Sequence, residues 1–521
     1  MNKYNCTRRD FVKAVGLGSA SLMLPACTRA RPQSTQSPPP VTKKPNILLI
    51  ISDEHNAGAL GCYGNDVIQT RNLNALAGRG VVFDNCYCNS PLSVPSRLSF
   101  TSGKYISRVG AWSNKCWLPS ADYPTLPRML NAAGYESVLC GKMHYDHTRR
   151  YGFTEIGGNM NRNRKTGAGK RRDPDDLQPK PGISGRFKQF HTAEDSGVLK
   201  HDRQVTAATV DFLRNRKADD KPLFLLAGYV APHFPLIVPE KYFRHYEGKV
   251  PMPVIPEGHL ESLVRNYKHL RIGFNVEDVP ADTVRKGREL YYGLTQWLDE
   301  QIGMVLDALA KSDLADNTIV VYTTDHGENM GEHDLWWKNC MFDHAARVPL
   351  IVSWPKRWNP GQRRTQACSL LDLMQTVAEL AGADVPKDCN GQSMVKWLDR
   401  PATKWKDMAV SEYYAHNIAS GFAMLRMGRF KYVYHTPADA DHPAEHELYD
   451  LHADPCEFHN LASESAHKDR IRKMHAALVN EIGEHPDSTE LRCRADYQRG
   501  YDRADAKGAS RTQKMITASA T

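Results

Sequence analysis

Asn46-Ile47-Leu48-Leu49-Ile50-Ile51 is an uninterrupted apolar run that ends in the polar cluster Ser52-Asp53-Glu54-His55. An apolar run without alternation is typical of a strand that is buried on both faces of a sheet. Four later stretches have the same character, and they are residues 137–139, 223–227, 318–323 and 350–352. Three of these also run into polar clusters, which are Gly141-Lys142-Met143-His144, Ala231-Pro232-His233 and Asp325-His326-Gly327-Glu328-Asn329.

Helical patterns separate these strands. Two stretches place apolar residues on one helix face, namely Val205, Ala208 and Phe212 in the first and Leu294, Leu298, Ile302, Val305 and Leu309 in the second. Strands that alternate with helices predict an α/β fold with a mostly parallel central sheet sandwiched by helices. Ligands bind beyond the carboxyl ends of the strands in such sheets, and the polar clusters lie there.

The pattern changes after about residue 385. Short strands are expected at residues 408–414, 423–426, 430–434 and 447–451, followed by a helix over 464–482. This order predicts a main domain over residues 44–385 and a smaller C-terminal antiparallel α+β subdomain over residues 386–490. Residues 491–521 are polar and have few large apolar groups, so we expect a loosely held tail there.

The first 27 residues have the features of an export signal. Arg8-Arg9 precede an apolar run over residues 14–24 that is too short to span a bilayer, and this pattern resembles a twin-arginine signal. Leu24-Pro25-Ala26-Cys27 is similar to a lipoprotein box, which would make Cys27 a lipid anchor; the alternative is a secretory signal without a lipid. Residues 28–43 form a proline-rich tether. We therefore expect an exported protein in the periplasm or at the cell surface, which touches a membrane only through Cys27.

The overall charge sets limits on the partners. A net charge of +9 over 521 residues suits an anionic ligand, but the basic residues are not gathered into one dominant run. We therefore expect no nucleic-acid partner. The twelve cysteines form no zinc-knuckle pattern and no close CxxC pair, and their spacing leaves any disulfide pairing open.

Ser93-Val94-Pro95-Ser96-Arg97 is the most distinctive short motif of the chain. If a helix begins near Pro95, Arg97 returns to the side of Ser93 and presents a guanidinium fork to an oxyanion. The alternative is an ordinary loop serine before a helix, with Ser96 as the N-terminal cap.

This motif resembles the signature of the type I sulfatases of the alkaline phosphatase superfamily, in which the first residue of [CS]-x-P-S-R is oxidised to formylglycine. The further family blocks occur in order between about residues 44 and 462, among them Gly141-Lys142-Met143-His144, Gly331-Glu332-His333 and the closing Glu447-Leu448-Tyr449-Asp450-Leu451. The resemblance implies an alkaline phosphatase-like fold and a catalytic sulfatase domain over residues 44–385. It also implies that a formylglycine-generating enzyme modifies Ser93.

Asp53, Glu54, Asp325 and His326 form a candidate metal site, because acidic clusters at the ends of two strands can supply hard oxygen ligands to one cation. The alternative is that each strand-terminal Asp caps the following turn. The resemblance implies one Ca²⁺ ion, with the formylglycine derived from Ser93 as a further ligand. Glu54 and His326 depart from the Asp and Asn that are frequent in the family.

The resemblance also implies roles in catalysis for six residues. Ser93, as formylglycine, would be the nucleophile, and Arg97 would hold it. Lys142 and Lys338 would neutralise the sulfuryl oxygens. His233, alone or together with Lys338, would protonate the leaving alcohol, and His144 would take the proton that releases sulfate.

The implied function is hydrolysis of sulfate esters, with sulfated polysaccharide or oligosaccharide as the expected substrate and choline sulfate or an aryl sulfate as further candidates. One alternative is a phosphomonoester or phosphonate ester hydrolase of the same superfamily. The other is a non-catalytic lipoprotein that binds sulfated glycans and keeps Ser93 unmodified.

A long polar insertion lies between His144 and a helix expected to start near Asp202. Its basic residues are Arg149, Arg150, Arg162, Arg164, Lys165, Lys170, Arg171 and Arg172. They favour either a solvated loop or a cover that meets a polyanionic substrate.

Overall fold

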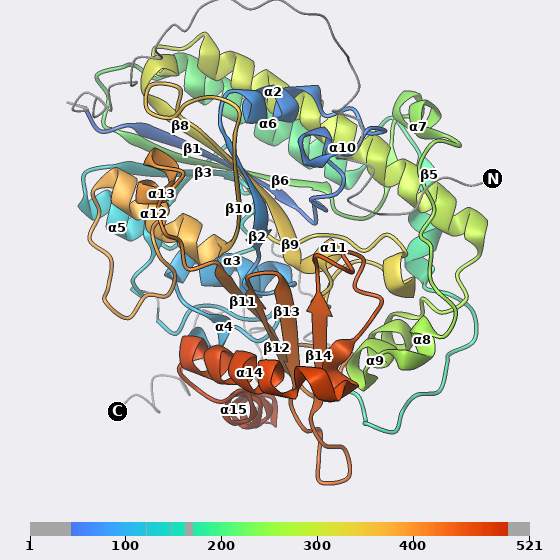
Figure 1. Ribbon diagram of the computed structural model, residues 1–521. Coiled ribbons are helices and arrows are strands. Elements are labelled where there is room, and N and C mark those ends of the chain that lie inside the picture. The colour runs from blue at the N-terminus through green and yellow to red at the C-terminus, as the bar shows by residue number, and fades with distance from the viewer. Residues whose placement is uncertain (1–42, 121, 147, 162–169, 499–521) are drawn as a thin grey trace, which may run out of the picture.

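The central sheet has eight strands in the order β10-β2-β9-β8-β1-β6-β3-β4 (Figure 1). This computed structural model describes residues 43–120, 122–146, 148–161 and 170–498. The strands are β1 (Asn46–Asp53), β2 (Val81–Tyr87), β3 (Glu136–Gly141), β4 (Thr154–Ile156), β6 (Leu223–Pro232), β8 (Thr318–Thr324), β9 (Arg347–Ser353) and β10 (Gln362–Ser369). All neighbouring pairs are parallel except those that β9 makes with β2 and β8, so the predicted fold class is confirmed.

β10 and β2, which form one side of the sheet, were not predicted from the sequence. β2 carries Asp84 and Asn85 in its middle, and the edge strand β10 begins with the polar run Gln362-Arg363-Arg364. Neither has the continuous apolar run that marks β1. Pairing with neighbouring strands, rather than local pattern, places these residues in the sheet.

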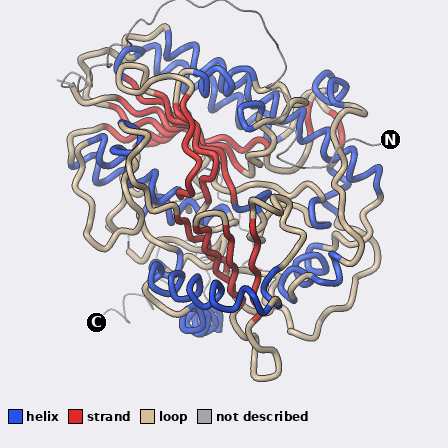
Figure 2. The backbone as a smooth tube through the Cα atoms, in the orientation of Figure 1, coloured by secondary structure: helices blue, strands red, loops and turns tan. Residues whose placement is uncertain are grey.

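Helices cover both faces of the sheet (Figure 2). One face is covered by α2 (Arg71–Gly78), α6 (Gly197–Asn215) and α10 (Ala281–Ala310), and the other by α3 (Ser93–Ser102), α5 (Leu126–Ala132), α12 (Leu370–Ala381) and α13 (Val395–Asp399). Leu48 and Ile50 of β1 pack into the first core, whereas Ile47, Leu49 and Ile51 pack into the second. This is why β1 is apolar at every position. The helix expected to start near residue 202 begins five residues earlier, after the Ser196 side chain caps it.

The C-terminal subdomain is a four-stranded antiparallel sheet with helices against it, as predicted. Its elements are β11 (Met408–Tyr413), β12 (Phe422–Met427), β13 (Phe430–His435), β14 (Glu445–Asp450), α14 (Lys468–Ile482) and α15 (Pro486–Gln498). The remaining elements are α4 (Ile106–Val109), β5 (His191–Thr192), β7 (Ile237–Val238), α7 (Glu240–Tyr246), α8 (His259–Ser262), α9 (Arg265–Phe274), α11 (Asp343–Ala346) and short 3₁₀ turns that include η2 (Gly185–Gln189) and η4 (Glu332–Asp334).

Residues 491–498, where we expected the tail to begin, are helical instead. α15 continues to Gln498, Cys493 is buried, and the indole of Trp112 donates a hydrogen bond of 2.8 Å to Asp496. Contacts with a distant segment therefore hold a helix whose own sequence is polar. The predicted signal over 1–27, residues 28–42 of the tether and the tail beyond 498 lie outside the described residues.

Two further findings concern cysteines and membrane spans. Among the described cysteines no pair forms a disulfide. In the same part of the chain, no helix is both long and apolar enough to cross a bilayer.

A buried lysine joins the C-terminal sheet to the main domain. Lys431 of β13 is completely buried, and its Nζ donates to the Met341 carbonyl at 2.8 Å, to Asp343 at 2.5 Å and to Glu457 at 2.6 Å. Burial opposes the charge of Lys431, but the two carboxylates raise the pKa of its ammonium group. The subdomain interface therefore depends on a matched set of buried charges.

We expect Lys431→Met to lower the free energy of unfolding by about 3–5 kcal/mol, because it leaves the buried carboxylate of Glu457 without its cation. Urea denaturation followed by circular dichroism measures this loss. Arg244→Ala is the control, since Arg244 makes only exposed pairs with Glu240 and Glu247 and should change stability by less than about 1 kcal/mol. Equal effects of the two substitutions would contradict the interpretation.

Candidate active site

Ser93 is the first residue of α3 and is 1% exposed. Its Oγ lies 2.9 Å from Nε2 of His326, at the carboxyl end of β8. The helix begins two residues before Pro95, whose missing N–H falls in the first turn, where it breaks no helical hydrogen bond. Ser96 is inside the helix, and its Oγ donates to the Asp325 carbonyl at 2.7 Å, so it is not the cap of the alternative interpretation.

Arg97 lies one turn after Ser93 and is 2% exposed. Its guanidinium donates to Asp53 Oδ2 and to Asp325 Oδ2, both at 2.8 Å, and to the Lys142 carbonyl at 2.9 Å. We expected the guanidinium fork to face an oxyanion near Ser93. Instead, the guanidinium N–H groups donate to the carboxylates of Asp53 and Asp325, so Arg97 fixes the positions of these two acids.

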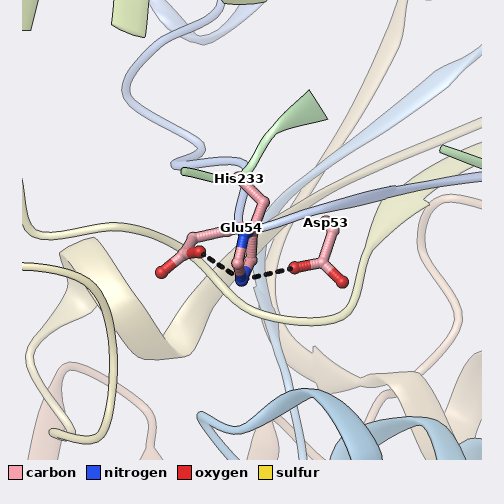
Figure 3. A group of neighbouring side chains, drawn as sticks. All are labelled: Asp53, Glu54 and His233. Atoms are coloured by element: carbon pink, nitrogen blue, oxygen red, sulfur yellow. Dashed lines mark ion pairs between the residues drawn. The ribbon is translucent and has the colours of Figure 1, made fainter. Parts of the chain in front are cut away.

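Two overlapping groups of side chains could hold a metal ion. The ligand atoms of Asp53, Asp325 and His326 lie within 4.8 Å of one another, and so do those of Asp53, Glu54 and His233. Figure 3 shows the imidazole of His233 between the carboxylates of Glu54 and Asp53, with its Nε2 at 3.1 and 3.8 Å from them. The structure thus brings together all four predicted ligands and adds His233.

The polar atoms of this cluster fit a divalent cation. Asp53 Oδ1 and Glu54 Oε1 are buried and receive no hydrogen bond from the described residues. Buried carboxylate oxygens without donors are unfavourable unless a cation compensates them. The backbone of Glu54 has a φ of 64°, in the left-handed region, and its N–H donates to Asp325 Oδ1 at 3.2 Å. This turn holds the carboxylates of β1 and β8 together.

Asp53, the last residue of β1, and Glu54, which follows it, differ in pKa. Burial by itself would raise the pKa of Asp53, but the charges of Lys142 and Arg97 hold it well below the usual range. Burial raises the pKa of Glu54 to about 8, although Lys338 lowers it. Asp53 is therefore an anion at neutral pH, whereas Glu54 keeps a proton until a cation or a higher pH removes it.

The predicted cations lie directly beside these acids. Lys142 Nζ is 2.6 Å from Asp53 Oδ2, and Lys338 Nζ is 3.0 Å from Glu54 Oε2. Burial lowers the pKa of the Lys142 ammonium, while Asp53 opposes this shift. His144 follows Lys142 on the same segment and is buried, with a φ of 59°.

His233 is neutral in this arrangement. Burial, together with the charge of Lys338, lowers its pKa well below the usual value. Nδ1 lies 2.6 Å from the Phe234 carbonyl, which can only accept, so Nδ1 carries the proton. Nε2 then accepts from Lys338 Nζ at 3.1 Å. In this arrangement Lys338 is the donor of the pair, and the role of His233 as the acid, alone or with Lys338, stays a prediction.

Sequence reasoning did not assign a role to Glu328. Its Oε1 accepts from the N–H groups of Met330 at 2.9 Å and Trp337 at 2.6 Å, so it holds the loop that carries Lys338. Its place in the polar cluster after β8 was the available signal, but only the fold shows what it contacts.

The basic insertion is largely paired within the protein. Arg149 pairs with Asp146, Arg150 with Glu155, Arg171 with Glu490 and Arg172 with Asp176. Arg162, Arg164 and Lys165 lie outside the described residues. Four of the charges that suggested a cover for a polyanion therefore stabilise the fold.

A buried serine at the start of a helix, an acidic cluster and flanking lysines at the carboxyl edge of a parallel sheet are typical of a hydrolase site for anionic esters. The chain matches the family described as Sulfatase over residues 45–383 and the N-sulphoglucosamine sulphohydrolase C-terminal family over residues 331–484. The protein belongs to the sulfatase family, and it is a sulfuric ester hydrolase.

Individual relatives differ in the substrate that their names state. A choline-sulfatase of Rhizobium meliloti is 31% identical over 81% of this chain and 83% of its own length. An N-acetylglucosamine-6-O-sulfatase of Bacteroides thetaiotaomicron is 27% identical over 87% of this chain and 88% of its own. Among solved structures, a phosphonate monoester hydrolase of Agrobacterium radiobacter superposes with a TM-score of 0.68, at 22% identity, covering 86% of this chain and 97% of that one.

We expect a divalent cation to bind more tightly as pH rises toward about 8, because Glu54 must lose a proton to serve as a ligand. The affinity should rise about tenfold per pH unit below that value and level off above it. Calcium should therefore raise the thermal midpoint by several degrees more at pH 8.5 than at pH 6.5.

Glu54→Gln should remove this pH dependence of calcium binding. Glu332→Gln is the control and should preserve it, because Glu332 pairs with Arg288 and does not belong to the acidic cluster. A calcium effect that is the same at both pH values in the unmodified protein would contradict the assignment of Glu54. Differential scanning calorimetry with and without a chelator gives the readout.

Proposed function

We propose that this sulfatase removes sulfate from sulfated oligosaccharides or polysaccharides, and that it uses a formylglycine derived from Ser93 and a Ca²⁺ ion. The observation that carries the proposal is the position of Ser93, whose Oγ lies 2.9 Å from His326 at the buried start of α3. The partial positive charge of a helix N-terminus favours negative charge that develops there. Formylglycine would supply a carbonyl carbon at this position, and thereby a route for sulfate release that an alcohol lacks.

Calcium is the proposed ion because most of the ligands are oxygens. Asp53, Glu54 and Asp325 would hold it, with His326 as the departure from an all-oxygen set. His326 Nδ1 lies 3.1 Å from the Gly327 carbonyl, which leaves Nε2 toward Ser93 and Asp325. A cation bound there would supply positive charge to the oxygens of the sulfate group.

The other residues of the site have separate roles in the proposed reaction. Arg97 holds the carboxylates of Asp53 and Asp325 in place one helical turn after Ser93. Lys142 and Lys338 supply positive charge for the sulfuryl oxygens. Lys338 also holds the proton that the leaving alcohol needs, and the neutral imidazole of His233 orients it at 3.1 Å. We keep His144 as the base for sulfate release, since it follows Lys142 on one buried segment.

Similarity to glycan sulfatases supports a carbohydrate substrate. One relative is named for a sulfated amino sugar, and a structure that superposes with a TM-score of 0.66 at 24% identity, over 85% of this chain and 99% of its own, was solved with its substrate D-glucosamine-2-N,6-O-disulfate. The phosphonate monoester hydrolase shares the fold, so an aryl phosphonate is the comparison substrate that tests the alternative function.

We further propose that the protein is exported and anchored by a lipid at Cys27. Support comes from the sequence Arg8-Arg9, the short apolar run that follows and the Leu24-Pro25-Ala26-Cys27 box. An exported enzyme would meet polymeric sulfated glycans outside the cytoplasm. A twin-arginine route would allow the formylglycine-generating enzyme to act on Ser93 before export.

Ser93→Ala should abolish turnover of 4-nitrophenyl sulfate and leave the thermal midpoint within a few degrees, because it deletes one small hydroxyl. The peptide that contains residue 93 should have lost two hydrogens in the active protein, as mass spectrometry would detect. Full activity with an unmodified serine would refute the proposed chemistry. Faster cleavage of an aryl phosphonate than of the aryl sulfate would favour the alternative function.

Cys27→Ser should move the protein from the membrane fraction to the soluble fraction, because the anchor would be lost. Fractionation after a high-salt wash, followed by immunoblotting, measures this. Cys62→Ser is a matched control that leaves the proposed anchor intact and should stay with the membrane. The lipoprotein proposal fails if the Cys27 variant also stays there.

A further inference from the structure

Arg186 is a charged residue next to the active site that the sequence analysis did not single out. It lies in η2, in the insertion that follows the Lys142 segment, and is half-buried. The next residue, Phe187, anchors this turn, since its ring packs at 5.2 Å from Trp336 and at 5.8 Å from Trp337. The N–H of Ser184 donates to the Asn275 carbonyl at 2.7 Å at the start of the turn. Arg186 is therefore held on an ordered element.

The guanidinium of Arg186 lies over three aromatic rings. Its central carbon is 4.4 Å from the ring centre of Trp337, 4.5 Å from that of Phe234 and 5.5 Å from that of Phe274. Contacts of this kind stabilise a cation and fix its plane without using its N–H donors.

Two of these rings belong to residues adjacent to catalytic side chains. Phe234 follows His233, and the two rings stack with centres 4.4 Å apart. Trp337 precedes Lys338, whose Nζ lies 5.8 Å from the Phe234 ring centre. Arg186 and Lys338 therefore both contact Phe234, which places Arg186 one aromatic ring away from the proton donor of the proposed reaction.

Arg186 has no acidic partner among the described residues. Within the described part of the chain its guanidinium forms neither an ion pair nor a hydrogen bond, whereas Arg150, Arg171 and Arg172 of the same insertion are each paired. Residues 162–169 of the same insertion contain no Asp or Glu in their sequence. Burial lowers the pKa of Arg186, and the more distant Glu54 and Glu328 oppose this shift, so the guanidinium stays charged.

A half-buried guanidinium with unused donors favours an anionic ligand, because each donor removed from water needs a new acceptor. We propose that Arg186 binds a second anionic group of the substrate, a carboxylate or a further sulfate, while the ester to be cleaved lies at Ser93. This inference rests on the proposed function and names the substrate class more narrowly, as a sulfate ester with at least one more negative charge.

The same arrangement disfavours choline sulfate. Its quaternary ammonium would need aromatic faces or an anion near the sulfate site, but Arg186 already covers the faces of Phe234 and Trp337 with a cation of its own. A substrate with a positive group would therefore meet a positive charge. Although a choline-sulfatase is among the relatives, we infer that this chain selects against that substrate.

Binding to the Ser93→Ala protein tests the inference without turnover. The ligands are phenyl sulfate, 3- and 4-carboxyphenyl sulfate, 1,3-phenylene disulfate and choline sulfate, with Kd measured by isothermal titration calorimetry in the presence of calcium. A charge-assisted pair predicts that at least one dianionic ligand binds about tenfold or more tightly than phenyl sulfate. The carboxylates and the disulfate together show which anion the subsite takes.

Arg186→Met should remove this preference for the dianion and raise the affinity for choline sulfate relative to phenyl sulfate. Arg186→Lys should keep a smaller preference, because it retains the charge but loses the fork. Lys188→Met is the matched control, since it removes an exposed charge from the same turn and should leave the preference intact.

The inference is overturned if no dianionic ligand is preferred, or if Arg186→Met keeps the full preference. Turnover of phenyl sulfate by the protein with Ser93 intact is measured separately. If the Ser93→Ala protein shows no preference for dianions but the protein with Ser93 intact turns over phenyl sulfate normally, only the role of Arg186 is refuted. If dianions are preferred but there is no turnover, the proposed chemistry is refuted and the anion subsite is supported.

Discussion

The ion pairs of Arg97 with Asp53 and Asp325 are the constraint on which the site depends. β1 and β8 are parallel neighbours paired up to Ser52 and Thr324, so the next residue of each strand brings two carboxylates together in a buried place. Two buried like charges repel strongly at low dielectric. A guanidinium from α3 satisfies both at 2.8 Å, and this fixes the start of α3 against the sheet edge. The position of Ser93, the proposed nucleophile, is thereby set by a structural ion pair rather than by the packing of its own side chain.

Charges around this pair alternate in sign. The carboxylates at the ends of β1 and β8 each have a lysine or arginine within 3.0 Å, and the two metal-ligand groups share Asp53. Such a site is close to neutral when its ligands are absent, so a divalent cation and a sulfate ester complement it best when both are present. Burial raises the pKa of Glu54 to about 8, so Glu54 is the group that most readily loses its proton when a cation binds. The chemistry of the site follows from this balance more than from any single residue.

Much of the fold could be predicted from local pattern. The five apolar runs became β1, β3, β6, β8 and β9, because a strand buried on both faces must be apolar throughout. The polar edge strand β10 and the polar helix α15 escaped prediction, since pairing with β2 and contacts such as that of Trp112 with Asp496 hold them in place. Elements whose stability comes from distant partners leave little trace in their own sequence.

The sequence by itself determined which residues collect at the active edge of the sheet. The strand pattern put Asp53 and Asp325 at one end of the fold, because the carboxyl ends of parallel strands meet there, and the resemblance of its motif to the sulfatase signature added Ser93 to them. Only the tertiary structure decided what each charge contacts. It showed that Arg97 bridges two acids, and it gave Arg186 no acidic partner among the residues that the structure describes. Charge is a property of one residue and can be read from the sequence, whereas pairing is a property of two residues that folding brings together.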